Sequence, residues 1–141
     1  MQLYFQNNFI NLSYDKQLRL GVAEWRGRLH GSELREAYLL CLEMINRFSL
    51  TKWLADDRMM GDISPADLKW GLEVHVPRMA QSSLLRLARI PSQFERNREA
   101  VDIMINKGYT YGLNLVIRDF MDKQEAMAWL LESTVATAPQ N

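Results

Sequence analysis

The stretch TKWLADDRMMGDISPADLKW, from Thr51 to Trp70, decides the fold class and marks the first place to look for a site. It predicts a short apolar strand over 52–56, a loop through Gly61 and a helix that begins at Pro65. The strand delivers polar residues into a loop and then to a helix N-terminus, where α/β folds usually place their functional groups. We therefore expect the functional surface near this loop and helix start.

The composition predicts a single globular domain with no bias toward a charged partner. The chain has 141 residues, and its 17 basic and 17 acidic side chains cancel to a net charge of zero, so nothing favours nucleic acid or an anionic membrane. No apolar run reaches the roughly 20 residues of a transmembrane helix. One cysteine permits no internal disulfide. We expect a cytoplasmic protein without a secretion signal, with one domain over 1–133 and a flexible tail over 134–141.

The first part of the chain predicts a β-hairpin followed by a helix. Apolar residues nearly alternate between Tyr4 and Trp25, on both sides of a turn at 14–16, which indicates two antiparallel strands. After Ser32, which can cap a helix, apolar residues recur every three or four positions and mark one buried face. They are Leu34, Tyr38, Cys41, Ile45 and Phe48.

The second part of the chain predicts further alternation of strands and helices. Ser64, Pro65 and Asp67 form a strong helix start, and Pro77 should end that helix near His75. The remaining elements are expected as strands at 84–90 and 113–117, a helix from a Ser92 and Glu95 cap to Gly108, and a helix from Asp122 to Leu130. This order predicts an α/β fold with a mixed, mostly parallel sheet, an N-terminal β-hairpin and about four helices.

Two neighbouring carboxylates, Asp56 and Asp57, raise the question of metal or acid–base chemistry at the end of the strand. Adjacent strand residues point to opposite faces, so capping of the loop or pairing with Arg58 is favoured over a shared cation. A hydrolase or transferase that uses Asp56, Asp57 and His75 is the least favoured interpretation. We expect no catalytic residues, no metal and no cofactor.

Other polar residues have structural interpretations beside their functional ones. Ser64 at a helix N-terminus could accept a phosphate, although capping alone explains it. The stretch from Arg78 to Glu99 is locally basic, but Arg86 and Arg89 differ by an odd number and so face opposite sides of a strand. A solvated set of arginines is favoured over an anion site. Cys41 is expected to be an inert core residue.

The residues proposed to bind a ligand or partner are Trp53, Asp57, Arg58, Met59, Met60, Ser64, Trp70 and Arg78. Tryptophan and methionine commonly line apolar pockets, and a methionine pair in a predicted loop is harder to assign to packing than one on a helix. We expect a non-enzymatic module that recognises a partner protein or a small apolar or anionic ligand. Homodimerisation through an edge strand is a further expectation.

The order of several motifs resembles that of small bacterial SpoIIAA-like proteins, most of which have no assigned function. The motifs are Tyr14-Asp15, Trp25-x-Gly27, Leu54-Ala55-Asp56-Asp57-Arg58, Ile63-x-Pro65-x-Asp67-x-x-Trp70, Pro77-Arg78 and Glu125-Ala126-x-Ala128-Trp129-Leu130. The resemblance covers about Tyr4 to Leu131 and implies a STAS-type fold related to the CRAL-TRIO lipid-binding domain. It implies either an apolar ligand or a partner switch like that of anti-sigma-factor antagonists, regulated by phosphorylation near Ser64.

Overall fold

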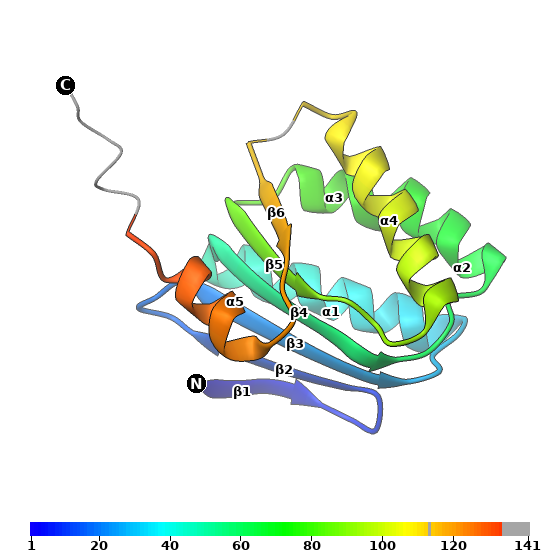
Figure 1. Ribbon diagram of the computed structural model, residues 1–141, viewed down its shortest axis with the longest axis horizontal. Helices are drawn as coiled ribbons and strands as arrows, with labels where there is room; N and C mark the ends of the chain where they lie inside the picture. Colours follow the sequence, from blue (N-terminus) through cyan, green and yellow to red (C-terminus); the bar gives the residue numbers. More distant parts are fainter. Residues whose placement is uncertain (113, 134–141) are drawn as a thin grey trace.

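The computed structural model describes residues 1–112 and 114–133, which form a six-stranded mixed sheet with helices on both faces (Figure 1). The strands are β1 (Gln2–Gln6), β2 (Ile10–Asp15), β3 (Leu20–Gly27), β4 (Lys52–Met60), β5 (Arg86–Ile90) and β6 (Val116–Asp119). They lie side by side in chain order; β1 to β3 are antiparallel and β3 to β6 are parallel. The expected α/β fold with an N-terminal hairpin and a mixed sheet is confirmed.

The helical segments are α1 (Ser32–Phe48), α2 (Pro65–Trp70), η1 (Gly71–His75), α3 (Val76–Ala80), α4 (Glu95–Tyr109) and α5 (Lys123–Leu130). The segments from α1 to α4 cover one face of the sheet, and α5 covers part of the other (Figure 1). The apolar stripe expected on the first helix is buried in the larger core, with Leu34 and Ile45 fully enclosed. None of the described helices is long and apolar enough to cross a membrane.

A smaller core lies between the sheet and α5. Its buried residues are Leu20, Val22, Leu54, Ala88, Ile90, Ala126, Trp129 and Leu130. Arg86 holds the end of α5 in place, because its guanidinium lies over the Trp129 ring and donates a hydrogen bond of 2.7 Å to the Trp129 carbonyl oxygen. Strand alternation therefore gives each face of β3, β4 and β5 its own core.

Strand β4 continues to Met60, so the loop expected from Asp57 to Gly61 is wrong in most of its length. Asp56 pairs with Glu24, but the next registered pair joins Met59 to Arg26. Two residues of β4 thus stand opposite one residue of β3, which is a β-bulge.

The bulge changes which side chains face the helices, since a shift of one residue exchanges the two faces of a strand. Met60 packs into the larger core and is 2% exposed, whereas Met59 is 59% exposed. Asp57 and Arg58 therefore belong to the strand, although their polarity favoured a loop at this point of the sequence.

The helix expected to end near His75 continues to Ala80 instead. The segment from Gly71 to His75 is a π-helix, in which the Val76 N–H donates to the Gly71 carbonyl oxygen five residues back. This wider turn accommodates Pro77, whose ring would clash with the carbonyl four residues earlier in a regular α-helix. The helical path therefore continues through the proline.

Two predicted helix caps are wrong. No side chain caps α1, which follows Gly31, and Ser32 is already its first helical residue. The Ser92 hydroxyl donates to the Met60 carbonyl oxygen at 2.7 Å, so it joins the segment after β5 to the end of β4, and α4 has no side-chain cap.

The other predicted caps are confirmed: Ser64 accepts a hydrogen bond from Asp67 N–H, and Asp122 accepts one from Glu125 N–H. The strands expected at 84–90 and 113–117 are observed at 86–90 and 116–119. Strand β1 was not expected. Residue 113 and the tail predicted over 134–141 lie outside the described residues.

The packing of Trp53 on Gly21 gives a direct test of this sheet. A Cβ atom at Gly21 would lie 2.6 Å from Trp53 Cζ3 and 2.9 Å from Leu50 Cδ1, so we expect Gly21→Ala to lower the free energy of unfolding by about 1–3 kcal/mol. Chemical denaturation measures this. Gly61→Ala is the matched control, because its Cβ meets only ordinary contacts from 3.4 Å. Equal effects of the two substitutions would contradict the packing described.

Candidate functional site

A cavity of about 130 Å³ lies between the sheet and the helix layer. Strands β3 to β6 form its floor, and α1, η1, α3 and α4 form its walls. Its lining is mostly apolar and rich in aromatic rings, with Trp25, Tyr38, Trp53, Leu87, Val101 and Met104 among the contributors. An engineered apolar cavity of about 150 Å³ accepts benzene, so this space suits a ligand of roughly ring size.

The cavity exists because α4 rests mainly on η1 and α3 and makes few contacts with the sheet. Ala55, Leu87 and Ile117 face the helix layer from three neighbouring strands, yet each is only partly buried. Side chains on that face of a covered sheet are normally enclosed. Their residual exposure marks the place where the two layers do not meet.

Asp57 lines the cavity from the bulged part of β4. Its side chain is buried, with 6% of the residue exposed, and no described residue forms a hydrogen bond or ion pair with its carboxyl group. Burial raises the pKa of Asp57 to about 7, and the nearby Arg89 guanidinium only partly opposes this effect. Asp57 therefore exchanges its proton near neutral pH.

Asp56 has a different environment on the opposite face of β4. Arg58 Nε and Nη2 donate to its two carboxylate oxygens at 2.9 Å and 2.7 Å. Although burial acts in the other direction, these bonds lower the pKa of Asp56. The expected pairing with Arg58 is confirmed for Asp56 but is wrong for Asp57, and the two carboxylates are not arranged to share a cation.

His75 and Tyr38 line the cavity from the helix layer, with ring centroids 4.1 Å apart in a stacked arrangement. His75 Nδ1 is buried and has no hydrogen-bond partner among the described residues. Burial lowers the pKa of His75 to about 3, so the ring is neutral at neutral pH. Cys41 also lines the cavity, and burial raises the pKa of its thiol, in keeping with an unreactive residue.

Arg89 brings a buried cation to the cavity from β5. Its Nε and Nη2 donate to Asp119 at 3.0 Å and 2.8 Å, and Nη2 also donates to Asp102 at 2.9 Å. Its Nη1 is buried without a partner among the described residues. The prediction that the arginines of this stretch are solvated is thus wrong for Arg89. The prediction that Arg86 and Arg89 face opposite sides of the strand is confirmed.

Comparison with solved structures connects this architecture to a known fold. No protein-family model and no curated protein matches the chain. An uncharacterized protein from the DUF3478 family with a SpoIIAA-like fold, from Shewanella loihica PV-4, matches with a TM-score of 0.54. The chain has a SpoIIAA-like fold. The match covers 90% of this chain and 99% of the other at 18% identity, so the SpoIIAA-like resemblance concerns the fold, and the site must be argued from its own residues.

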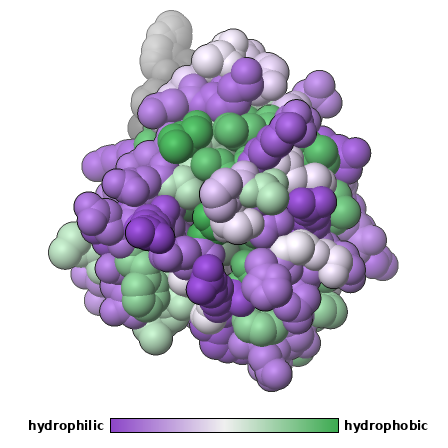
Figure 2. All heavy atoms as spheres, turned by 90° about the vertical axis from the view of Figure 1, so that its right-hand side faces the viewer, coloured by the Kyte–Doolittle hydropathy of each residue, from purple (hydrophilic) through white to green (hydrophobic). Residues whose placement is uncertain are grey.

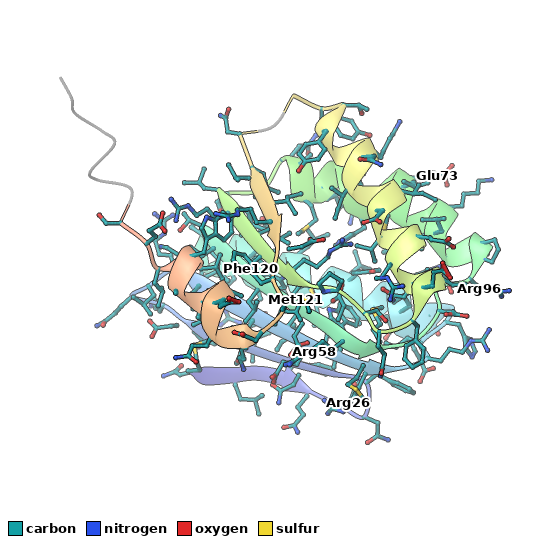
Figure 3. All side chains as sticks on the ribbon, viewed as in Figure 1. Arg26, Arg58, Glu73, Arg96, Phe120 and Met121 are labelled. Atoms are coloured by element: carbon teal, nitrogen blue, oxygen red, sulfur yellow. The ribbon has the colours of Figure 1, made fainter. Side chains whose placement is uncertain are left out.

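The structure brings only two of the proposed binding residues of this SpoIIAA-like chain to the cavity, Trp53 and Asp57. Met60 is buried in the larger core, and Met59, the residue before it on β4, is exposed. Arg58 pairs with Asp56 on the other face, and in Figure 3 it lies below α5 and away from α3 and α4.

The remaining candidates lie on the helix layer. Trp70 is partly buried and stacks on Tyr38 with centroids 6.3 Å apart, while Arg78 is exposed on α3. The Ser64 hydroxyl donates to Asp67 Oδ2 at 2.9 Å and accepts from Asp67 N–H at 3.2 Å. A phosphate on Ser64 would break these bonds beside a carboxylate, although phosphorylation there remains an untested prediction.

Tyr38, His75 and Arg89 were not among the proposed binding residues. Helical spacing placed Tyr38 on the buried face of α1, and strand alternation placed Arg89 on one side of β5. Neither pattern indicates that the two layers stand apart at this point. The missing information is a packing distance between elements far apart in the chain.

Replacement of Asp57 by asparagine tests the burial of its carboxyl group. Because the folded-state pKa of about 7 exceeds 3.8, the ordinary value expected in the unfolded chain, the wild type loses stability relative to Asp57→Asn as pH rises from about 4 to about 7. The difference is constant above that range. Urea denaturation at several pH values measures this difference. His75 has the opposite dependence, but both proteins contain it and its effect cancels.

Asp62→Asn, outside the cavity, is the matched control for this experiment. A stability difference between wild type and Asp57→Asn that stays the same across the whole range would contradict a buried, unpaired carboxyl group.

Proposed function

We propose that this protein is a non-enzymatic binding module whose cavity between the sheet and helices α1, η1, α3 and α4 holds a small, largely apolar ligand. One observation carries the proposal: polar groups that have no partner among the described residues lie on residues that line an apolar cavity. They are the buried nitrogens His75 Nδ1 and Arg89 Nη1, and the Asp57 carboxyl group, with which no described residue forms a hydrogen bond or ion pair.

The energetics of these groups support a ligand. A buried polar group without a partner costs roughly 1–3 kcal/mol, and most proteins leave few such groups. A pocket with apolar walls and a few polar groups of this kind is the usual form of a small-molecule site. A bound molecule would cover the exposed parts of Ala55 and Leu87 and could satisfy some of the polar groups.

Binding is supported over catalysis by the state of the candidate reactive groups. The thiol of Cys41, a nucleophile type that lines the cavity, stays protonated because burial raises its pKa. Asp56, part of the hydrolase or transferase hypothesis, is bound to Arg58 on the far side of β4.

A protein partner is the second candidate, supported by surface composition. Figure 2 shows one end of the molecule, where apolar residues gather in the upper part among hydrophilic ones. The proposed contact residues come from separate elements, however: Arg58 and Met59 from β4, and Arg78 from α3. Homodimerisation through an edge strand, β1 or β6, stays a prediction that light scattering can test.

Filling the cavity tests the proposed function. We expect isoamyl alcohol, a small branched molecule of suitable size, to shift the indole N–H signals of Trp25 and Trp53 saturably in an NMR titration. Ala55→Leu adds carbon atoms to the cavity floor and should weaken binding at least tenfold. Ala128→Leu makes the same change at an exposed position on α5 and should leave binding unaltered.

Two outcomes would contradict this proposal. One is the absence of saturable shifts in the wild type. The other is equal binding by folded Ala55→Leu and Ala128→Leu, which would place the ligand elsewhere.

A further inference from the structure

We infer that the ligand is a small organic cation, such as a branched alkylammonium ion, whose charge pairs with the Asp57 carboxylate. This inference rests on the proposed function of the cavity and specifies the chemical class of its ligand.

Asp57 has no cationic side chain in direct contact among the described residues. Arg89 is near enough for its charge to act on Asp57, yet no ion pair joins the two. The Arg89 guanidinium instead binds Asp119 through two of its nitrogens and Asp102 through one of them. A buried carboxylate is strongly favoured by an opposite charge, and the described part of the chain supplies none in direct contact.

The charged side chains around the cavity carry an excess of negative charge when Asp57 is ionised. Arg89 is accompanied by three carboxylates, those of Asp57, Asp102 and Asp119. Asp102 and Asp119 have about half of their side chains exposed, at 56% and 51%, so water screens much of their charge. They still offset the charge of Arg89, which leaves an ionised Asp57 as the unbalanced group. An anionic ligand could accept a hydrogen bond from Arg89 Nη1 but would meet this excess negative charge, whereas a cation would neutralise the charge and leave Nη1 without an acceptor.

The cavity has an aromatic wall. Trp25 and Trp53 line it, and a tryptophan ring attracts an ammonium group that lies over its face. The Tyr38 hydroxyl has no hydrogen-bond partner among the described residues and can accept an N–H from the ligand. His75 is neutral near pH 7 and so does not repel a cation.

The volume of the cavity, about 130 Å³, suits a molecule of about six non-hydrogen atoms. Isoamylamine, isoamyl alcohol and isovalerate share one branched hydrocarbon group and differ in charge. They separate recognition of the cation from recognition of the apolar group.

Binding of the cation should depend on pH. The titratable and charged groups around Asp57 are Asp56 on β4, Arg89 on β5, Asp119 on β6, Asp102 on α4, His75 on η1, and Tyr38 and Cys41 on α1. Of the groups that line the cavity, Asp57 changes charge near neutral pH, with a pKa of about 7. Affinity for the amine should therefore increase as pH rises toward that value and level off above it.

The test compares the three isosteric ligands by calorimetry on the full-length wild type and Asp57→Asn above the pKa of Asp57. We expect the wild type to bind isoamylamine at least tenfold more tightly than isoamyl alcohol, and isovalerate least. A tenfold ratio corresponds to about 1.4 kcal/mol, close to the lower end of what a hydrogen bond to a charged group contributes. Asp57→Asn should lose the preference for the amine and its pH dependence while still binding the alcohol. Asp62→Asn should retain both.

The outcomes separate this inference from the proposed function. Equal binding of amine and alcohol by the wild type, or an unchanged amine preference in Asp57→Asn, would overturn the cation while leaving an apolar ligand site. Failure of all three ligands to bind a folded wild type would overturn both. Tightest binding of isovalerate would assign the cavity to anions.

Discussion

The buried, unpaired carboxyl group of Asp57 is the constraint on which the rest of the site depends. Removing a carboxylate from water is costly, and none of the described residues forms an ion pair with Asp57 to offset that cost. The carboxyl group can be tolerated because the helix layer stands off the sheet beside it and leaves a cavity. Three further features lie around the same space, and their functional interpretation depends on it. They are the aromatic lining, the neutral His75 ring and Arg89 Nη1, which has no hydrogen-bond partner among the described residues.

The bulge in β4 lets the same face of the strand carry the buried carboxyl group of Asp57 and a core residue. On the cavity side it presents Asp57, and beyond the bulge it returns Met60 to the core. On the opposite side, Asp56 and Arg58 form a bidentate pair near α5. Two adjacent aspartates therefore have opposite environments: an arginine stabilises the charged form of Asp56, whereas burial raises the pKa of Asp57 to about 7.

The sequence predicted the architecture better than it predicted the site. Apolar spacing located α1, and strong caps located α2 and α5, because these signals are local. The end of β4 was wrong since its last residues are polar, and only pairing with β3 shows that they continue the strand. The predicted stop at Pro77 failed because a π-helical turn relieves the steric clash. His75 was grouped with Asp57 only in the least favoured interpretation, and Arg89 was not assigned to the site, because the cavity is formed by elements distant in the chain.

The pKa of the Asp57 carboxyl group tests the central claim most directly. It can be measured from the chemical shift of the carboxyl carbon by NMR across a pH titration of the ligand-free wild-type protein. A midpoint near 7 is the result expected for a buried carboxyl group without a cation. A midpoint at or below 3.8, the ordinary value for an aspartate, would show that Asp57 is solvated or paired, and would contradict a buried carboxyl group at the cavity.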